Sequence, residues 1–473
     1  MKILEQLLCQ LTGAHLVGAL GGPILRVHTD TRTLQPGDLF VALKGESFDA
    51  HTFLAQAKAA GAVGALAQEG LEQAELGGVE VPDSLVGLGE LAGLWRQQWH
   101  LPLIAVAGSN GKTTVTQMIA SVLRAAAGDA SLATQGNFNN HIGVPLTLLR
   151  LRETHRMAVV ELGMNHPGEI AYIAGLAAPT VALVNNAQRE HQEFMATVEA
   201  VAQENGEAIR ALPVDGVAVF PSDDEHTPIW RALAQQRNQL TFSDTDAGAD
   251  VHATQANWID GAWAVHMVTP AGDRDCTLHI AGRHNVRNAL AATACALAAG
   301  VSLDVIVGGL SAFEPVGGRS RALGLNLPGG PVTLVDDTYN ANPDSVVAAI
   351  RVLAELPAPR LLVLGDMGEV GEQGLAFHLE VLRLALASGI ESVHVAGDWM
   401  QQAVQALDKE GSIAIRHWPD VDALATHVGE SIDQQRSVLV KGSRFMRMER
   451  VVKAAQARAS TEQQQEKEPT HAA

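Results

Sequence analysis

The stretch LPLIAVAGSNGKTTVTQMIASVLRAAAG, residues 101–128, sets the strongest constraint on the architecture of this chain. The apolar run LIAVA predicts a buried strand, the turn SNG follows it, and an amphipathic segment that opens at Lys112 predicts a helix. A glycine turn between a strand and a helix N-terminus directs several backbone N–H groups at one point, where anions bind. In such a loop Lys112 can reach the β- and γ-phosphates of a nucleotide, and the Thr113 hydroxyl can ligate Mg²⁺. The predicted phosphate-binding residues are Gly108, Ser109, Asn110, Gly111, Lys112, Thr113 and Thr114.

The spacing of the glycines in this loop differs from the common phosphate-loop pattern. In that pattern the first glycine stands five residues before the second, but Val106 occupies this position and Gly108 stands nearer to Gly111. The alternative is a chance glycine turn at the start of a helix. The strand before the loop and the amphipathic helix after it favour phosphate binding.

Composition limits the class of protein. A chain of 473 residues with 47% apolar and 18% charged residues is too long for one ordinary core, and it predicts a globular protein of about three domains. A formal net charge of −19 opposes binding to a nucleic acid backbone. The three widely spaced cysteines predict reduced thiols rather than a disulfide framework or a zinc site. With no secretory signal and no membrane span in the sequence pattern, we expect a cytoplasmic enzyme.

The first two domains are predicted from alternating strand and helix patterns. Residues 36–67 read as a turn, a strand, a polar loop, a helix and a second strand, which predicts a small N-terminal α/β domain over residues 1–98. The apolar strands MAVVEL, TVALVNN and GVAVF follow the loop at helical separations. This alternation predicts a central, doubly wound sheet of the P-loop type over residues 99–313.

The C-terminal third repeats the same alternation. The strands VTLVDD, RLLVLG, SVHVAG and SVLVKG predict a Rossmann-like sheet over residues 314–457. The Gly/Pro-rich run FEPVGGRSRALGLNLPGGP at its start predicts a hinge or linker. The polar, low-complexity end, residues 458–473, predicts a disordered tail. The expected fold class is therefore α/β, with three domains.

Strand ends supply further candidate residues. Phosphoryl transfer requires positioning and charge neutralisation, so metal ligands are expected at the ends of strands beside the phosphate loop. Glu161, which ends MAVVEL, is such a candidate. Asp336 and Asp337 end a strand of the third domain, and Asn342 can cap the helix that follows.

Several motifs together resemble one family. GSNGKTT, TQGNFNNHIGVPLTLL, ELGMNHPGEI, GRHNVRNALAA, DDTYNANPDS, LGDMGEVG and LVKGSR occur in the order and approximate spacing of the Mur ligases, and the resemblance covers about residues 1–455. It implies an enzyme that uses ATP and Mg²⁺ to activate a carboxylate as an acyl phosphate, which an amine attacks to give an amide, ADP and phosphate. The glycine spacing also agrees, because the family's own loop has this form.

The resemblance narrows the substrates. NANP and KGSR favour the family members that join D-alanyl-D-alanine to UDP-N-acetylmuramoyl-tripeptide in peptidoglycan synthesis. Another amino-acid or polyglutamate ligase of the superfamily is an alternative, and so is a nucleotide-binding module without ligase activity. The expected partners are thus these two small molecules and no nucleic acid, and the protein is expected to be a monomer.

The resemblance also assigns roles near the nucleotide. The implied catalytic residues are Lys112, Glu161, His191 and Arg319. The implied metal site comprises Thr113, Glu161 and His191. The implied ATP contacts beyond the loop are Asn288, Arg319, Asp337 and Tyr339. A planar guanidinium suits the γ-phosphate, whereas an Asn near a helix start, such as Asn288, often serves only local hydrogen bonding.

Two further segments are implied to bind the peptide-bearing substrates. TDTRTLQPGDLFVALKGESFDAH resembles the family's uridine-diphosphate pocket, although a turn followed by a charged loop is ordinarily solvent-facing. Its candidate contacts are Asp30, Thr31, Arg32, Lys44 and Ser47. The loop GNFNN and the motif NANP supply amide groups for the peptide and the amino substrate, against the alternative of ordinary Asn-rich turns and caps. These candidates are Asn137, Asn139, Asn140, Asn340 and Asn342.

One position departs from the family. Mur ligases commonly carry, fourteen residues after the metal-ligating histidine, a lysine that is carbamylated and helps to position a second Mg²⁺. Counting from His191 leads to Asn205, and no lysine lies between residues 189 and 209. Glu204 should face elsewhere, because one helical residue turns the side chain by about 100°. We therefore hypothesise that Asn205 is a neutral polar replacement and that activity needs no bicarbonate, with loss of function as the alternative.

Overall fold

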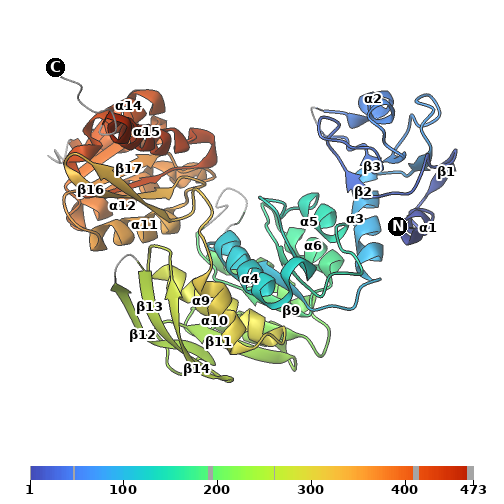
Figure 1. Ribbon diagram of the computed structural model, residues 1–473, viewed down its shortest axis with the longest axis horizontal. Helices are drawn as coiled ribbons and strands as arrows, with labels where there is room; N and C mark the ends of the chain where they lie inside the picture. Colours follow the sequence, from blue (N-terminus) through green and yellow to red (C-terminus); the bar gives the residue numbers. More distant parts are fainter. Residues whose placement is uncertain are drawn as a thin grey trace, which may run out of the picture.

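The computed structural model describes residues 2–45, 48–189, 195, 197–259, 262–408 and 415–465. Within these residues the chain forms three β-sheets, each with its own helices. The three resulting bodies follow one another along an arc, with the central body between the first, drawn in blue, and the third, drawn in orange and red (Figure 1). The predicted α/β class with three sheets is confirmed.

The first body is a mixed sheet of five strands in the order β1-β5-β4-β3-β2. Its strands are β1 (His15–Val17), β2 (Arg26–His28), β3 (Asp38–Val41), β4 (Gly64–Ala67) and β5 (Gly78–Glu80). Its helices are α1 (Lys2–Leu8), α2 (Leu54–Ala59) and α3 (Ser84–Arg96), with the 3-10 turn η1 (Ala50–Phe53). The strand, helix and strand predicted within residues 36–67 are β3, α2 and β4. Strand β1 is antiparallel to β5, and the other pairs are parallel.

The central body holds nine strands in the order β14-β13-β12-β11-β10-β9-β6-β8-β7. Its strands are β6 (Leu103–Ala107), β7 (Ser131–Ala133), β8 (Met157–Glu161), β9 (Val181–Val184), β10 (Val217–Pro221), β11 (Asn238–Ser243), β12 (Val251–Ile259), β13 (Ala262–Thr269) and β14 (Gly272–Leu278). Its helices are α4 (Lys112–Ala127), α5 (Gly143–Leu148), α6 (Glu169–Ala177), α7 (Val198–Arg210), α8 (Thr227–Ala234), α9 (His284–Ala298) and α10 (Leu303–Ser311), with the 3-10 turn η2 (Gly128–Ala130). The predicted strands β6, β8, β9 and β10 are confirmed, and β6 lies between β8 and β9 in parallel pairing.

Strand β6 is apolar throughout because helices cover both faces of the sheet. Ala105 belongs to a hydrophobic cluster with residues of α5 and α6, whereas Ile104 and Val106 belong to a second cluster with residues of α4, α9 and α10. A strand buried on both faces is expected to lack polar alternation. This packing fixes the end of β6, from which the phosphate loop begins.

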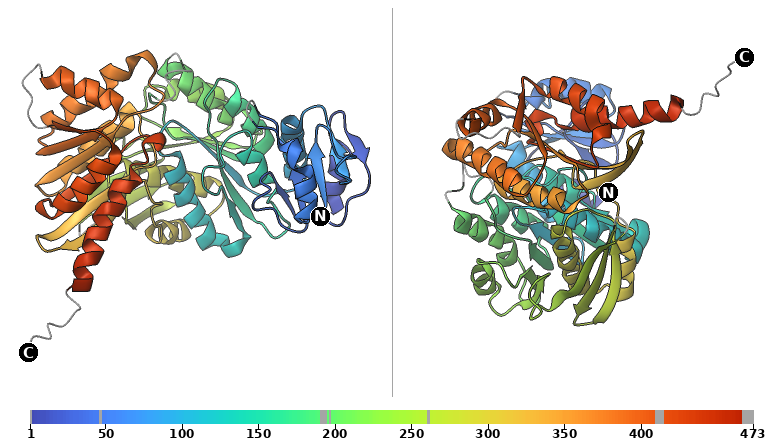
Figure 2. Two further views of the ribbon diagram at one scale, coloured as in Figure 1. Left: turned by 90° about the horizontal axis from the view of Figure 1, so that it is seen from above. Right: turned by 90° about the vertical axis from the view of Figure 1, so that its left-hand side faces the viewer.

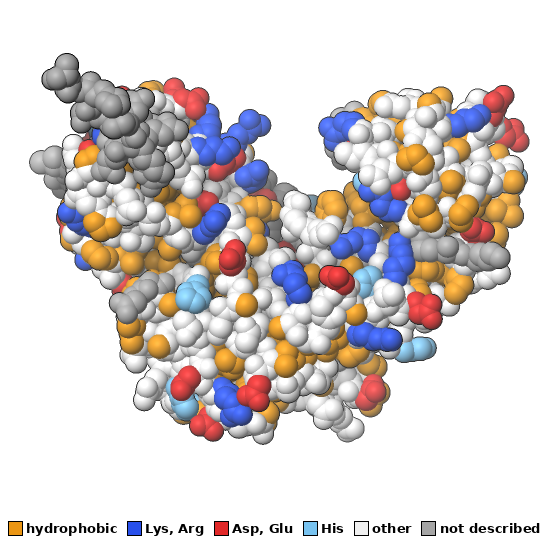
Figure 3. Space-filling model, viewed as in Figure 1, with side chains coloured by type: hydrophobic (Ala, Val, Ile, Leu, Met, Phe, Trp, Pro, Cys, Tyr) orange, Lys and Arg blue, Asp and Glu red, His pale blue; other side chains and the backbone are white. Residues whose placement is uncertain are grey.

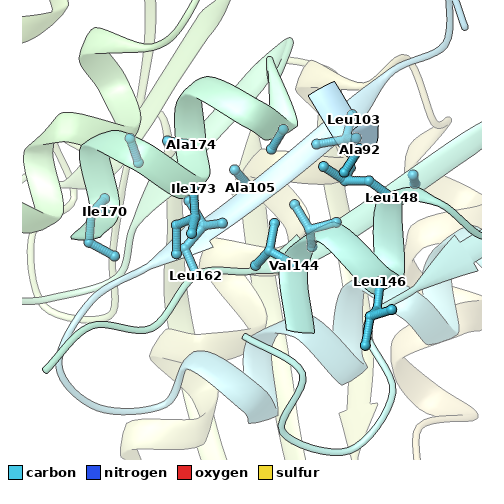
Figure 4. Close-up of a cluster of buried hydrophobic side chains, with 14 of the residues drawn as sticks. Ala92, Leu103, Ala105, Val144, Leu146, Leu148, Leu162, Ile170, Ile173 and Ala174 are labelled. Atoms are coloured by element: carbon cyan, nitrogen blue, oxygen red, sulfur yellow. The ribbon is translucent and has the colours of Figure 1, made fainter. Parts of the chain in front are cut away.

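Helix α3 fixes the first body to the central one. Trp95 donates its indole N–H to the Leu151 carbonyl at 3.2 Å, and the buried Arg96 guanidinium donates to the carbonyls of Ala177 and Ala178 at 2.8 and 3.0 Å. These carbonyls end α6 and need such donors. Ala92 of α3 packs in the same apolar cluster as Leu103, α5 and α6 (Figure 4). The two bodies therefore share one core.

The third body has six strands in the order β15-β16-β20-β17-β18-β19. Its strands are β15 (Arg321–Leu327), β16 (Gly330–Asp337), β17 (Arg360–Gly365), β18 (Ser392–Ala396), β19 (Ile415–Trp418) and β20 (Ser437–Lys441). Its helices are α11 (Pro343–Glu355), α12 (Gly374–Ala387), α13 (Asp398–Asp408), α14 (Val421–Ser431) and α15 (Glu449–Gln465), with the 3-10 turns η3 (Gly371–Gln373), η4 (Ile432–Gln434) and η5 (Arg444–Met446). All pairs except β15 with β16 are parallel, as a Rossmann-like sheet requires.

Two predictions about the third body were wrong in part. Residues 321–327 form strand β15 instead of a hinge, because Leu325 and Leu327 alternate with exposed residues and pack into the core. Residues 458–465 are helical instead of disordered, because α15 continues to Gln465. The spacing of Val451, Ala455 and Ala459 keeps one side of this helix buried. Helix α15 extends from the third body toward the C-terminus in Figure 2.

No helix in the described parts of the chain combines the length and the apolar character needed to cross a membrane. The limits of the three predicted domains and of the tail beyond residue 465 stay predictions.

Candidate active site

The phosphate loop connects β6 to α4 through two glycines that no other residue could replace without strain. Gly108 has φ 133° and Gly111 has φ 80°, both in the left-handed region. A Cβ at Gly111 would lie 2.7 Å from Asn288 Oδ1 and 2.8 Å from Asn185 Nδ2. Helix α4 begins directly after Gly111, at Lys112, so its unpaired N–H groups open at the loop. The predicted strand, loop and helix are confirmed.

Asparagine side chains beneath the loop hold its shape. Asn185 Nδ2 donates to the Asn110 carbonyl at 2.9 Å and to Asn288 Oδ1 at 3.0 Å. Asn186 Oδ1 accepts the Asn110 N–H at 2.9 Å. Asn185 and Asn186 were not among the predicted site residues, although they stand at the carboxyl end of a parallel strand beside β6, where ligands commonly bind.

Asn288 takes part in this scaffold. Its Nδ2 donates to Asn285 Oδ1 at 2.8 Å and its Oδ1 accepts from Asn185, and the side chain is buried. It also lines the cavity described below. Its predicted contact with adenine stays a prediction, and its observed hydrogen bonds support the loop.

Lys112 and Thr113 occupy the first turn of α4. The ammonium of Lys112 donates to the carbonyls of Gly108 at 2.5 Å and Ser109 at 2.9 Å, so it curls over the loop. Thr113 donates its hydroxyl to Glu161 Oε1 at 3.0 Å. Both residues line the cavity described below.

Glu161 is a buried carboxylate at the end of β8. Its Oε1 also accepts from Asn139 Nδ2 at 2.8 Å, and its backbone N–H donates to Thr134 Oγ1 at 2.9 Å. Its Oε2 is buried with no hydrogen-bond partner among the described residues. A buried carboxylate oxygen needs a cation or a donor, so this atom fits a divalent ion.

The metal site predicted from sequence is only partly described. Glu161 and Thr113 lie together, but His191 is outside the described residues. Within the described part of the chain, no group of three or more His, Cys, Asp or Glu residues could hold a metal ion. An ion bound here would need ligands from the nucleotide or water as well as from the protein.

Asn205 and Glu204 lie in helix α7 and point to different elements. Asn205 is 1% exposed and its Oδ1 accepts the Gly108 N–H at 3.0 Å. Glu204 accepts the Ile170 N–H of α6 at 3.0 Å. The prediction that Glu204 faces away from the phosphate loop is confirmed.

The third body presents a second polar group to the loop. Asp337 accepts from Lys441 Nζ at 2.6 Å and from the Ser320 N–H at 3.0 Å. The guanidinium of Arg319 stacks on the Tyr339 ring, with 3.9 Å between the Arg319 Cζ and the ring centroid. Lys441 is 4% exposed and was not predicted as a site residue, although it belongs to the motif LVKGSR.

Direct contacts join the phosphate loop to the third body. Asn342 caps α11 with its Oδ1 on the Ser345 N–H, and its Nδ2 donates to Asn110 Oδ1 at 3.0 Å. The predicted cap is therefore confirmed, and the same amide reaches the loop. Arg189 donates to Asp344 at 2.6 Å and to Glu380 at 2.9 Å. Hydrogen bonds with Glu380 and then Asp344 raise the pKa of this guanidinium.

A cavity of about 1520 Å³ lies between the central and third bodies and is lined by residues of both. It includes every predicted ATP contact except Gly108, together with Glu161. It also includes all five asparagines proposed for the peptide substrates: Asn137, Asn139, Asn140, Asn340 and Asn342. The volume exceeds that of an ordinary small-molecule site, so two or more ligands can be held together.

The candidate uridine-diphosphate contacts lie in the first body, outside that cavity. Arg32 pairs with Asp30 at 2.7 Å, and this hydrogen bond lowers the pKa of Asp30 to about 2. Lys44 pairs with Asp49 at 3.3 Å, Thr31 is half-buried, and Ser47 is outside the described residues. The surface is hollowed between the first and third bodies, and Lys and Arg side chains lie on both sides of the hollow (Figure 3).

The fold and the site together define a phosphate-loop protein whose nucleotide site is completed by a second domain. The Mur ligase middle domain matches residues 106–296, and the Mur ligase, glutamate ligase domain matches residues 318–444. The UDP-N-acetylmuramoyl-tripeptide–D-alanyl-D-alanine ligase of Escherichia coli is 41% identical over 432 residues, which cover 91% of this chain and 93% of that relative. The chain belongs to the Mur ligase family.

Solved structures agree with this assignment. MurF from Acinetobacter baumannii has a TM-score of 0.86 and 35% identity, with 96% of this chain and 97% of that chain covered. The MurF ligase from Thermotoga maritima in complex with ADP has a TM-score of 0.80 and 25% identity, with 92% and 98% covered. The similarity therefore extends over all three bodies.

Proposed function

We propose that this protein is an ATP-dependent amide ligase that joins D-alanyl-D-alanine to UDP-N-acetylmuramoyl-tripeptide and releases ADP and phosphate. This reaction would belong to the synthesis of peptidoglycan precursors in the cytoplasm. One observation carries the proposal: the phosphate loop, Glu161 and Arg319 face one cavity that also holds five asparagine amides. The similarity to the E. coli ligase named for this reaction, over 93% of that relative, supports the choice of substrates.

ATP is the nucleotide that the loop is proposed to bind. The T. maritima relative is in complex with ADP, and the loop offers the N–H groups of a helix N-terminus. Lys112 now contacts two loop carbonyls, and phosphate oxygens would replace these acceptors when the nucleotide binds. Arg319, held on Tyr339 at the opposite wall, is proposed to approach the terminal phosphate.

Thr113 and Glu161 are the residues that would hold Mg²⁺. The unpaired Oε2 of Glu161 supports this assignment, and His191 is a further proposed ligand. When bound, the ion would neutralise charge on the phosphate oxygens. Asn139 would keep Glu161 oriented, since it donates to the other carboxylate oxygen.

The proposed reaction has two steps. A carboxylate oxygen of the tripeptide attacks the γ-phosphorus and ADP leaves, which forms an acyl phosphate. The amine of D-alanyl-D-alanine then attacks the acyl carbon, phosphate leaves, and the amine loses a proton. Lys112 and Arg319 offset the charge of the transferred group, and the protein supplies no covalent nucleophile. Orientation of the two reactants can lower the barrier by about 7–11 kcal/mol.

The position of the third body matters for this chemistry, because an acyl phosphate in open water would hydrolyse. The contacts of Asn110 with Asn342 and of Arg189 with Asp344 hold that body against the loop. The asparagines of the loop GNFNN and of the motif NANP are proposed to bind the peptide and the amino substrate. Asp30, Thr31, Arg32, Lys44 and Ser47 are proposed to bind the distant uridine diphosphate.

The test is ADP formation by the purified chain with UDP-N-acetylmuramoyl-tripeptide and D-alanyl-D-alanine, supplied separately and together. We expect rapid ADP formation only when both are present. Stimulation by glutamate but not by D-alanyl-D-alanine would contradict this choice and favour a polyglutamate-type ligase. ATP binding without turnover in every mixture would favour a non-catalytic nucleotide-binding module.

A further inference from the structure

Asn205 connects helix α7 to the phosphate loop from 97 residues away in sequence. Its Oδ1 accepts the Gly108 N–H at 3.0 Å, and the side chain is almost fully buried. Gly108 packs tightly against Asn185, since a Cβ at Gly108 would lie 3.0 Å from the Asn185 backbone nitrogen. The acceptor half of the Asn205 amide therefore fixes the first residue of the loop.

The donor half of the same amide has no partner. Asn205 Nδ2 is buried and forms no hydrogen bond with any described residue. A buried donor without an acceptor is costly, and native proteins leave few of them. The amide cannot escape this cost by flipping, because Nδ2 would then face the Gly108 N–H, donor against donor. The direction of the free N–H groups is therefore fixed by the loop.

A second unpaired atom at the loop has the complementary chemistry. Glu161 Oε2 is buried without a partner, while Glu161 Oε1 is tied to the loop through Thr113. Asn205 Nδ2 lacks an acceptor, and Glu161 Oε2 lacks a cation or a hydrogen-bond donor. A nucleoside triphosphate with its divalent ion supplies both, because phosphate oxygens accept hydrogen bonds and the ion binds carboxylate oxygen.

The neighbouring residue gives a contrast on the same helix. Glu204 is also buried, but it accepts the Ile170 N–H and belongs to the packing of α6 on α7. Helix α7 thus carries two adjacent polar residues, one with a structural partner and one with half of its hydrogen bonds unmade.

We propose that Asn205 is a binding and positioning residue of the nucleotide site. Its oxygen holds Gly108, and its nitrogen donates to an anionic oxygen of the bound triphosphate. The inference rests on the proposed function only in assuming that the loop binds ATP. A neutral amide at this position serves as a donor to the nucleotide, so it needs no covalent modification to act.

The experiment compares Asn205→Asp and Asn205→Leu with the wild-type chain, and uses Glu204→Gln as the matched control. Equilibrium binding of ADP and of a non-hydrolysable ATP analogue is measured with and without Mg²⁺, alongside the thermal unfolding midpoint. Asp keeps an acceptor for Gly108 but buries a charged oxygen in place of the amide nitrogen, so Asn205→Asp and Asn205→Leu should both unfold earlier than the wild type. Both should bind the analogue about tenfold more weakly, whereas Glu204→Gln should stay within about twofold.

The two variants separate the donor from other causes. Leu removes both halves of the amide without adding charge, and Asp removes only the nitrogen but adds charge, so the amide nitrogen is the one group that both lack. If either variant binds the analogue as tightly as the wild type, Asn205 Nδ2 does not donate to the nucleotide and the inference is overturned. Should Asn205→Leu fail to fold, Asn205→Ala replaces it, since Ala also lacks both halves.

The wild-type chain distinguishes this inference from the proposed function. Wild-type protein that binds neither nucleotide would contradict the proposed function and the inference with it. Wild-type protein that binds the analogue but never forms the amide would contradict the function alone, and the variants would still test Asn205 through binding.

Discussion

Lys112 is the residue on which the nucleotide site depends most directly. Its ammonium donates to the carbonyls of Gly108 and Ser109 at 2.5 and 2.9 Å, and these two hydrogen bonds need not persist when phosphate binds. Its identity and position could be predicted from GSNGKTT alone, because the strand, the glycine turn and the helix are all local in sequence. The side chains that hold the loop could not be predicted in this way, because Asn185 and Asn205 bond to it, and Asn288 bonds to Asn185, from distant elements.

Replacing Lys112 by Ala should lower kcat by about 10²–10³-fold, because the cation that offsets charge on the transferred phosphate is removed. The thermal unfolding midpoint should change little, since the loop glycines and asparagines remain. Steady-state ADP formation measures the first quantity. A Lys112→Ala variant with wild-type kcat would contradict the role of this residue.

Replacing Glu161 by Gln should raise the Mg²⁺ concentration needed for half-maximal binding of the ATP analogue. Gln keeps an oxygen for Thr113 and Asn139, so the fold is retained, but the negative charge is lost. Titration calorimetry at several Mg²⁺ concentrations provides the measurement. An unchanged Mg²⁺ dependence would show that the unpaired Oε2 does not bind the ion.

Activity should not depend on bicarbonate, because Asn205 cannot form a carbamate. The assay removes CO₂ from enzyme and buffer, measures the ligation rate, and then adds bicarbonate. The rate should be the same before and after addition. Clear restoration of a lost rate would refute the hypothesis of a neutral replacement.

At the scale of elements, prediction succeeded where the pattern was local and strongly apolar. Strands β6, β8, β9 and β10 are continuous apolar runs, and the third body's parallel strands have the same form. The antiparallel strands β12–β14 were missed because their sequence is polar over much of its length, with β14 exposed at most positions. Strand β15 was missed because Gly and Pro surround its alternating leucines. The predicted end of helix α15 came too early in the sequence, because the burial of Ala459 depends on packing against another element.

The ion pair between Asp223, which follows β10, and Arg287 of helix α9 makes a pH-dependent contribution to the stability of the fold. Burial alone would raise the pKa of Asp223, but hydrogen bonds from Arg287, Ser243 and Thr245 lower it from 3.8 to about 2. A lowered carboxylate pKa stabilises the fold above the ordinary value, and this stabilisation is lost as the pH falls from about 4 toward 2.

Asp223→Asn should therefore lower the free energy of unfolding at pH 7 by about 1 kcal/mol, after allowance for partial exposure of the pair. It should also flatten the decline in stability between pH 4 and pH 2. Urea unfolding at several pH values gives both quantities. Equal pH dependence in the two proteins would contradict this assignment.

At the scale of the whole molecule, side-chain contacts at the cavity hold the third body against the central one. Arg189 bonds two carboxylates of the third body and lies over the Phe377 ring at 5.4 Å. Asn110 and Asn342 form the second contact, directly at the loop. Neither contact could be predicted from the sequence, because local sequence patterns do not indicate which side chains meet between domains.

Replacing Arg189 by Ala should loosen this arrangement. We expect a larger radius of gyration by small-angle scattering and a several-fold higher KM for ATP, with smaller change in thermal stability. Arg210→Ala is the matched control, because Arg210 pairs only with Glu207 of its own helix among the ion pairs of the described residues. Identical scattering and KM in the wild type and Arg189→Ala would show that the pair does not control closure.

The central claim is that the loop delivers the γ-phosphoryl group to a carboxylate of the substrate. The direct measurement uses UDP-N-acetylmuramoyl-tripeptide with ¹⁸O in the reacting carboxylate and follows the label by mass spectrometry after ligation. An acyl-phosphate route transfers one ¹⁸O atom to each inorganic phosphate released and leaves the other in the new amide. Phosphate that contains no ¹⁸O would mean that the carboxylate never attacked phosphorus, and it would contradict this account.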